Sequence, residues 1–116
     1  MAERSSYWML DANGEAVPAP DVETWGHWYK TADRTVAQAV DEGDPAKTVR
    51  VSTVFLGLDH NFAATGPPIL WETLVFGGVL DGEMRRYSSR DAALLGHQEM
   101  CNRVNATLQH PGKERP

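Results

Sequence analysis

The 116-residue chain lacks several features that would point to a particular class of protein. It has one cysteine, Cys101, which excludes an intramolecular disulfide and a zinc site built from several cysteines. No run of about 18 apolar residues is present, so we expect no transmembrane helix. Residues 1–4 lack the apolar stretch of a signal peptide. These absences predict a protein of the reducing cytoplasm.

Basic residues are also scarce. The sequence has 11 Lys and Arg against 16 Asp and Glu, which gives a formal net charge of -5. A protein that binds nucleic acid mainly through phosphates needs a surplus of basic residues. We therefore do not expect nucleic acid as the main partner. The acidic and basic residues are mixed along the chain, as is usual for a soluble surface.

Length and composition fit one folded domain. The sequence is 41% hydrophobic and 23% charged, and both values are close to the average for globular proteins. A chain of this length can bury a core without a disulfide or a structural metal. We expect neither a metal nor a cofactor.

Turn signals and hydrophobic patterns predict an α+β fold, in which an antiparallel sheet of four or five strands packs against a long C-terminal helix and a shorter N-terminal helix. Short turns between the strands favour antiparallel pairing. The predicted single domain has five successive segments: a β-hairpin in 1–20, a helix over 21–32, the sheet over 35–87, a helix over 88–108 and a loose tail over 109–116.

Local signals support these boundaries. Asn13-Gly14 is a strong hairpin turn, and Asp21 can cap the first helix. Ser88 can open the second helix as a capping residue. In that helix, the residues spaced four apart are expected to face the sheet, namely Ala92, Gly96, Met100 and Val104. The strands within 48–58 and 69–76 should be antiparallel neighbours.

Three segments of the chain resemble a known family. They are VSTVFLGLDHNF at 51–62, GPPILWETLVFGG at 66–78, and Arg86-Tyr87-Ser88 followed by Gly96-His97. Together they are similar to small accessory proteins encoded by tailed bacteriophages, prophages and related mobile elements. The resemblance implies a phage gene expressed in the cytoplasm of a bacterial host, and it implies no particular reaction.

A candidate contact surface follows the longest apolar strand. Asp59, His60, Asn61 and Phe62 place adaptable polar groups beside an aromatic side chain, a combination suited to a binding hot spot. Two prolines at 67–68 stiffen the exit of this loop. We add Trp28 of the first helix to these candidates. In the alternative interpretation, Phe62 covers the core, and Asp59 and Asn61 only close the turn through hydrogen bonds to its backbone.

A second hypothesis is a metal-dependent enzyme that uses His60, Glu72 and His97. The spacing of these residues matches no ligand motif, and Glu72 is better interpreted as the partner of Arg50 or Arg86 across the sheet. Cys101 is interpreted as a packing thiol. The sequence therefore predicts no catalytic residues.

The sequence and the resemblance together favour a binding protein over an enzyme. Its partner would be a host protein or a small ligand. In the most specific version it counters bacterial defence, either by binding a defence protein such as a CRISPR effector or by sequestering a nucleotide signal. A third hypothesis is a phage structural or assembly component that associates with itself through an edge strand.

Overall fold

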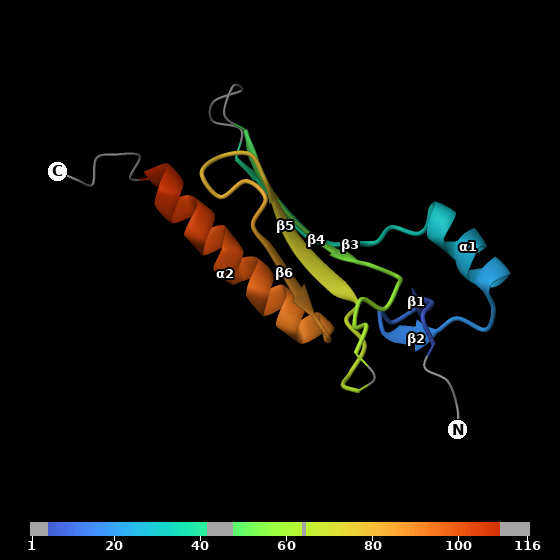
Figure 1. The fold of residues 1–116 in the computed structure, drawn as a ribbon. Coiled ribbons are helices and arrows are strands. Elements are labelled where there is room, and N and C mark those ends of the chain that lie inside the picture. Colours follow the sequence, from blue (N-terminus) through green and yellow to red (C-terminus); the bar gives the residue numbers. More distant parts are fainter. Residues whose placement is uncertain (1–4, 42–47, 64, 110–116) are drawn as a thin grey trace.

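The computed structural model describes residues 5–41, 48–63 and 65–109, and it shows the expected α+β domain (Figure 1). Residues 1–4 of the predicted hairpin segment and residues 110–116 of the predicted tail lie outside the described part. The helices and strands are, in chain order, β1 (Trp8–Leu10), β2 (Ala16–Pro18), α1 (Val22–Thr31), β3 (Thr35–Asp41), β4 (Val49–Phe55), β5 (Trp71–Phe76), β6 (Met84–Tyr87) and α2 (Arg90–Gln109).

The main sheet has four strands in the order β3-β4-β5-β6, and every neighbouring pair is antiparallel. The predicted pairing of β4 with β5 is confirmed, with Thr53 opposite Thr73. Burial alternates strictly along β4, so that Val49, Val51 and Phe55 point into the core. This alternation follows from the period of two in a strand. In the described part of the chain, no helix lies over the other face of the sheet (Figure 1).

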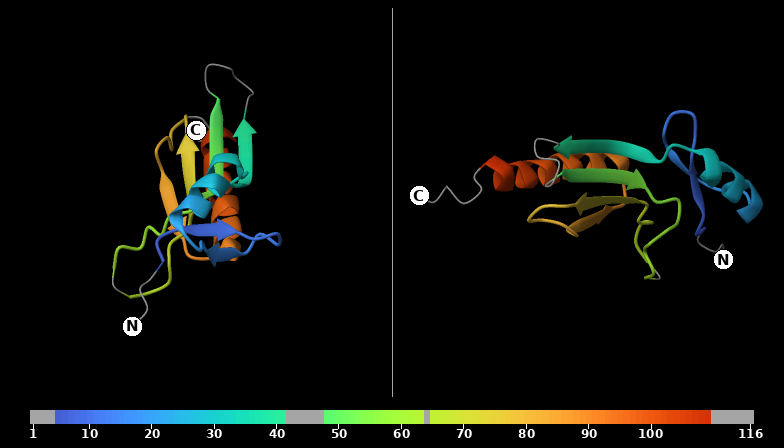
Figure 2. Two further views of the ribbon diagram at one scale, coloured as in Figure 1. Left: turned by 90° about the vertical axis from the view of Figure 1, so that its right-hand side faces the viewer. Right: turned by 90° about the horizontal axis from the view of Figure 1, so that it is seen from above.

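Helix α2 covers one face of the sheet, and the two views in Figure 2 show it lying along the strands. Met100 and Val104 pack on Val51 and Val75 to form one part of the core. The expected inward line of α2 was wrong at its first position, because Ala92 is exposed and Ala93 is fully buried. The capping residue is Ser89 and not Ser88: the Ser89 hydroxyl accepts a hydrogen bond from the backbone N–H of Ala92 at 3.1 Å.

The hairpin β1-β2 and helix α1 lie beyond one end of the main sheet (Figure 1). Asp21 caps α1 as predicted, since its carboxylate accepts a 2.7 Å bond from the N–H of Thr24. The helix is attached through aromatic side chains, and the Trp25 indole N–H donates to the Gly57 carbonyl at 3.0 Å. Gly57 has φ of +78°, and a Cβ there would lie 3.1 Å from the Tyr29 ring, so this close approach requires glycine.

No helix in the described part of the chain is both long enough and apolar enough to cross a membrane.

The two helical glycines predict opposite effects of the same substitution. A Cβ on Gly26 of α1 would meet no atom within 4 Å beyond the helix's own backbone, whereas one on Gly96 of α2 would overlap the ring of Tyr87. Gly26→Ala should therefore raise the free energy of unfolding by about 0.5–1 kcal/mol. Gly96→Ala should lower it by about 1–3 kcal/mol through overpacking. Urea unfolding of both variants measures this, and equal effects of the same sign would contradict the packing described for α2.

Candidate functional site

The segment between β4 and β5 forms a loop at the end of the main sheet, on the side of the hairpin (Figure 1). Backbone bonds hold its two ends in place. The N–H of Asp59 donates to the Ser6 carbonyl at 3.0 Å, and the N–H of His60 donates to the Ile69 carbonyl at 2.9 Å. We call the described residues of this loop, 59–63 and 65–69, the contact loop.

Two side chains fix the path of the contact loop. One carboxylate oxygen of Asp59 accepts from the N–H of Asn61 at 2.8 Å and from that of Ile69 at 2.9 Å. The Asn61 amide donates to the carbonyls of Thr65 at 3.2 Å and Pro67 at 2.7 Å, and its oxygen accepts from Ala63 at 2.9 Å. The expected bonding of Asp59 to the loop backbone is thus confirmed. These bonds specify the loop's shape as a backbone ladder would.

Phe62 lies exposed on this framework, with 86% of its surface accessible to solvent. The interpretation in which Phe62 covers the core is therefore wrong. The half-buried His60 lies beside it, with ring centroids 6.0 Å apart. His60 Nδ1 is 2.8 Å from the Leu58 carbonyl, which can only accept, so this nitrogen carries the proton. The bond orients the imidazole and leaves Nε2 as an acceptor when the ring is neutral.

Trp28 belongs to a different environment. Its ring is half-buried and meets Phe55 edge-on, with centroids 6.0 Å apart. It packs on the part of the core that contains Phe55 and Trp71. The structure places Trp28 in the attachment of α1 to the core.

The three residues of the metal-enzyme hypothesis are not brought together. Glu72 lies on the uncovered face of the sheet and accepts from the Arg86 guanidinium at 3.0 Å, which is one of the two pairings predicted for it. His97 is buried under the opposite face, and His60 is in the contact loop. Across residues 5–41, 48–63 and 65–109, no group of three or more His, Cys, Asp and Glu side chains could hold a metal ion.

A chain of polar side chains, called the polar chain below, joins the sheet to α2; it is buried at its centre and half-buried at Tyr87 and Cys101. It was not predicted from the sequence. The Tyr87 hydroxyl donates to Thr73 Oγ1 at 3.0 Å, and the hydroxyls of Thr73 and Thr53 are 2.6 Å apart. Thr53 Oγ1 is 2.8 Å from His97 Nδ1, and His97 Nε2 is 3.5 Å from Cys101 Sγ. Two signals were present: threonine at inward positions of two apolar strands, and His97 and Cys101 four residues apart on one helix.

The polar chain has a structural role. Burial lowers the pKa of His97 and raises the pKa of the Cys101 thiol, and both shifts favour the neutral form. A nucleophilic cysteine needs the opposite arrangement, in which a thiolate is stabilised by a nearby positive charge. With both groups neutral, the pair satisfies polar groups at the interface of α2 and the sheet.

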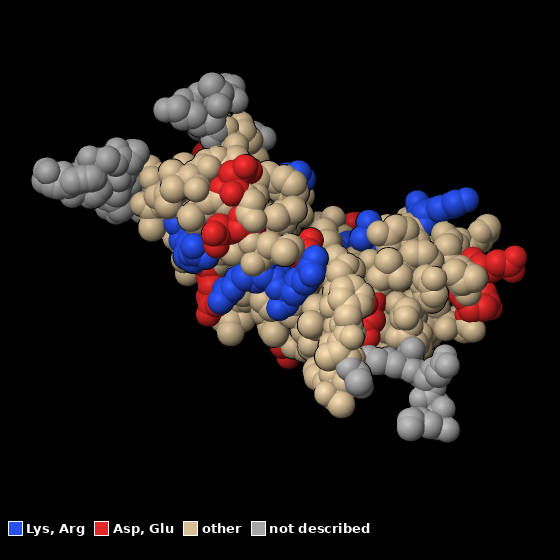
Figure 3. Space-filling model, viewed as in Figure 1, with Lys and Arg blue, Asp and Glu red and all other residues tan. Residues whose placement is uncertain are grey.

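Charges of both signs lie close together over β6 and α2 on the face seen in Figure 3. Two ion pairs account for part of this pattern: Arg85 with Glu99 at 2.9 Å, and Arg103 with Glu83 at 3.3 Å. These groups are largely exposed, so each pair contributes little to stability.

Comparison of the chain with protein-family models, with curated proteins and with solved structures found no match.

The buried His97 predicts a loss of stability in mild acid. An unfolded histidine has a pKa of about 6.5, and the folded value is lower. Below about pH 6.5 the unfolded state thus binds more protons, and the free energy of unfolding should fall as the pH drops toward the folded pKa. Above that pH, the contribution of His97 should be constant.

Urea unfolding at about pH 7.5 and about pH 5 measures this effect. His97→Gln should reduce the difference between the two values, whereas His27→Gln, at an exposed histidine of α1, should leave it unchanged. A pH difference that persists in full in His97→Gln would assign it to other groups.

The exposure of Phe62 predicts that it contributes little to folding. Phe62→Ala should change the free energy of unfolding by less than about 0.5 kcal/mol, as is usual for a surface position. Phe55→Ala, at a fully buried position, should cost about 3–5 kcal/mol. A loss of about 3 kcal/mol in Phe62→Ala would mean that the side chain packs on the protein in solution.

Proposed function

We propose that this chain is a small binding protein that contacts a host protein through the contact loop, with Phe62 as the main point of contact. One observation carries the proposal: a large aromatic side chain, 86% exposed, is held on a loop whose backbone is fixed by Asp59 and Asn61. A folded protein gains nothing for its own stability from such a residue.

The energetics of the loop support a binding role. Burying a Phe side chain in a partner's pocket contributes about 1.5–3 kcal/mol. Ordering a flexible loop on binding would offset part of that gain, but this loop already has its hydrogen bonds in the free protein. His60 and Asn61 beside Phe62 supply polar groups for the edge of the contact.

The shape of the surface favours a protein over a small ligand. Small-molecule sites are concave, whereas Phe62 projects from the molecule and needs a cavity on its partner. Of the two partners expected from the sequence, a host protein or a small ligand, the surface therefore favours a host protein.

The resemblance of 51–62 and 66–78 to phage accessory proteins supplies the biological setting of the proposal. In that setting the partner is a protein of the bacterial cytoplasm, and interference with anti-phage defence is the specific role we propose. An enzyme is not proposed, because His60, Glu72 and His97 lie apart and the His97–Cys101 pair is neutral.

The test is quantitative affinity capture from bacterial lysate with the wild-type chain, followed by titration of the captured protein against purified variants. Phe62→Ala should weaken the Kd by about 30-fold, which corresponds to a hot spot of about 2 kcal/mol. Val79→Ala is a matched control, since Val79 is an apolar residue 82% exposed in the β5–β6 connection. Equal affinities of Phe62→Ala and the wild-type chain would contradict the proposal.

A further inference from the structure

The two edge strands of the main sheet differ in how they are protected. Strand β6 has four residues, two of which are Arg85 and Arg86, and short charged edges resist further pairing. Strand β3 has seven residues, and it carries neither a charge nor a proline before Asp41. Within the described part of the chain, β3 pairs with β4 alone. Beyond the irregularity between Thr35 and Ala37, its outer edge therefore pairs with no other strand of the described part.

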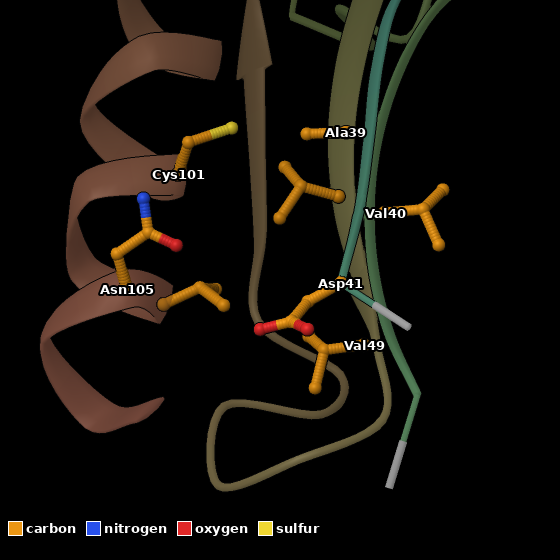
Figure 4. A pocket seen from close by; sticks show the side chains of 8 residues that line it. Ala39, Val40, Asp41, Val49, Cys101 and Asn105 are labelled. Atoms are coloured by element: carbon orange, nitrogen blue, oxygen red, sulfur yellow. The ribbon is translucent and has the colours of Figure 1, made fainter. Parts of the chain in front are cut away.

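A groove runs beside this edge. Helix α2 lies mainly over β4 and β5, and the space of about 80 Å³ left between α2 and β3 is lined by Ala39, Val51, Cys101, Val104 and Asn105, among others. Figure 4 shows Ala39 and Asp41 pointing toward α2, Val40 pointing away from it, and the Cys101 sulfur directed at the sheet. The small side chain of Ala39 leaves the groove open at the strand.

We propose that β3 and this groove receive an extended segment of a partner protein, which adds to the sheet as a fifth strand. Side chains of a strand point alternately to its two sides. Every second residue of the added segment would thus enter the groove and contact Ala39, Cys101 and Val104. The backbone of the segment would form hydrogen bonds with β3 within 37–40, as in other cases of strand addition.

The size of the site selects an extended segment over a helix or a second copy of this chain. A helix is about 10 Å across and does not fit the groove. A stable dimer buries about 800 Å² on each partner, and a strip seven residues long and one strand wide supplies only on the order of 300 Å². In a two-fold pair joined at β3, the two α2 helices would also lie about 19 Å apart, beyond packing distance.

The groove also defines the chemistry of the segment. Its walls are aliphatic apart from Cys101 and the polar end at Asp41 and Asn105, so the inward residues of the segment are apolar and uncharged. Strand β4 is an example of such a sequence, since its inward residues Val49 and Val51 alternate with Arg50 and Ser52. The role of this edge is separate from that of Phe62.

Cys101, the single cysteine of the chain, lines the groove, so its rate of reaction with a thiol reagent reports whether the groove is occupied. The probe is a blocked peptide with the sequence of Val49–Phe55, and the control peptide has the same composition without the alternation. The β4 peptide should slow the reaction of Cys101 with a thiol reagent about tenfold at nine times its Kd, following 1 + [L]/Kd. Amide exchange within 37–40 should slow in the same titration, and the control peptide should have neither effect.

Variants locate the binding to the groove. Ala39→Arg and, independently, Asn105→Arg should abolish the protection, and both positions are exposed, so the fold is retained. Leu95→Arg introduces the same charge on α2 at a position 63% exposed and away from the groove, and it should leave the protection intact. The proposal is overturned by no protection of Cys101, by equal protection from both peptides, or by a wild-type dimer that Ala39→Arg dissociates.

Discussion

The hydrogen-bonded chain from Thr73 through Thr53 to His97 is the interaction on which the arrangement of this molecule depends. Apolar contacts between α2 and the sheet, such as those of Met100 and Val104, have no direction and would tolerate a shift of the helix. The buried hydroxyls and the imidazole do not, because a shift would leave polar groups without partners in the core. They fix α2 over the two central strands. Because α2 lies mainly over β4 and β5, it covers little of the side of β3 that faces it, and the groove remains between them.

The same two strands position the contact loop. It connects the ends of β4 and β5, which α2 holds together through the polar chain, so its two ends start from a rigid part of the domain. Asp59 and Asn61 then extend that rigidity to the residues around Phe62 through short bonds to the backbone. An exposed aromatic residue on a rigid loop is what remains after folding has satisfied the surrounding polar groups. This sequence of constraints connects the packing of the core to the proposed contact.

Local signals in the sequence predicted most of the fold. Asn13-Gly14 and Asp21 act within a few residues, and the short turns favoured the antiparallel pairing of β4 with β5 that the structure shows. The line through Ala92 failed because steps of four residues drift by about 40° each on a helix of 3.6 residues per turn, so the inward face follows Ala93 instead. The bonds of Asp59 were predictable since they lie within ten residues. The chain through His97 was not, because it requires the register of β4 against β5 and the position of a helix 44 residues from Thr53.

The central claim is that Phe62 is presented by a loop that is ordered before any partner binds. ¹⁵N relaxation of the free protein tests this claim most directly, through the order parameters of the backbone amides at 59–63, 65–66 and 69. The account predicts values of about 0.85, similar to those of β4, because the side chains of Asp59 and Asn61 already hold the loop in the free state. Values below about 0.6 around Phe62 would show that the loop is flexible, and they would contradict the claim of a contact surface formed in advance.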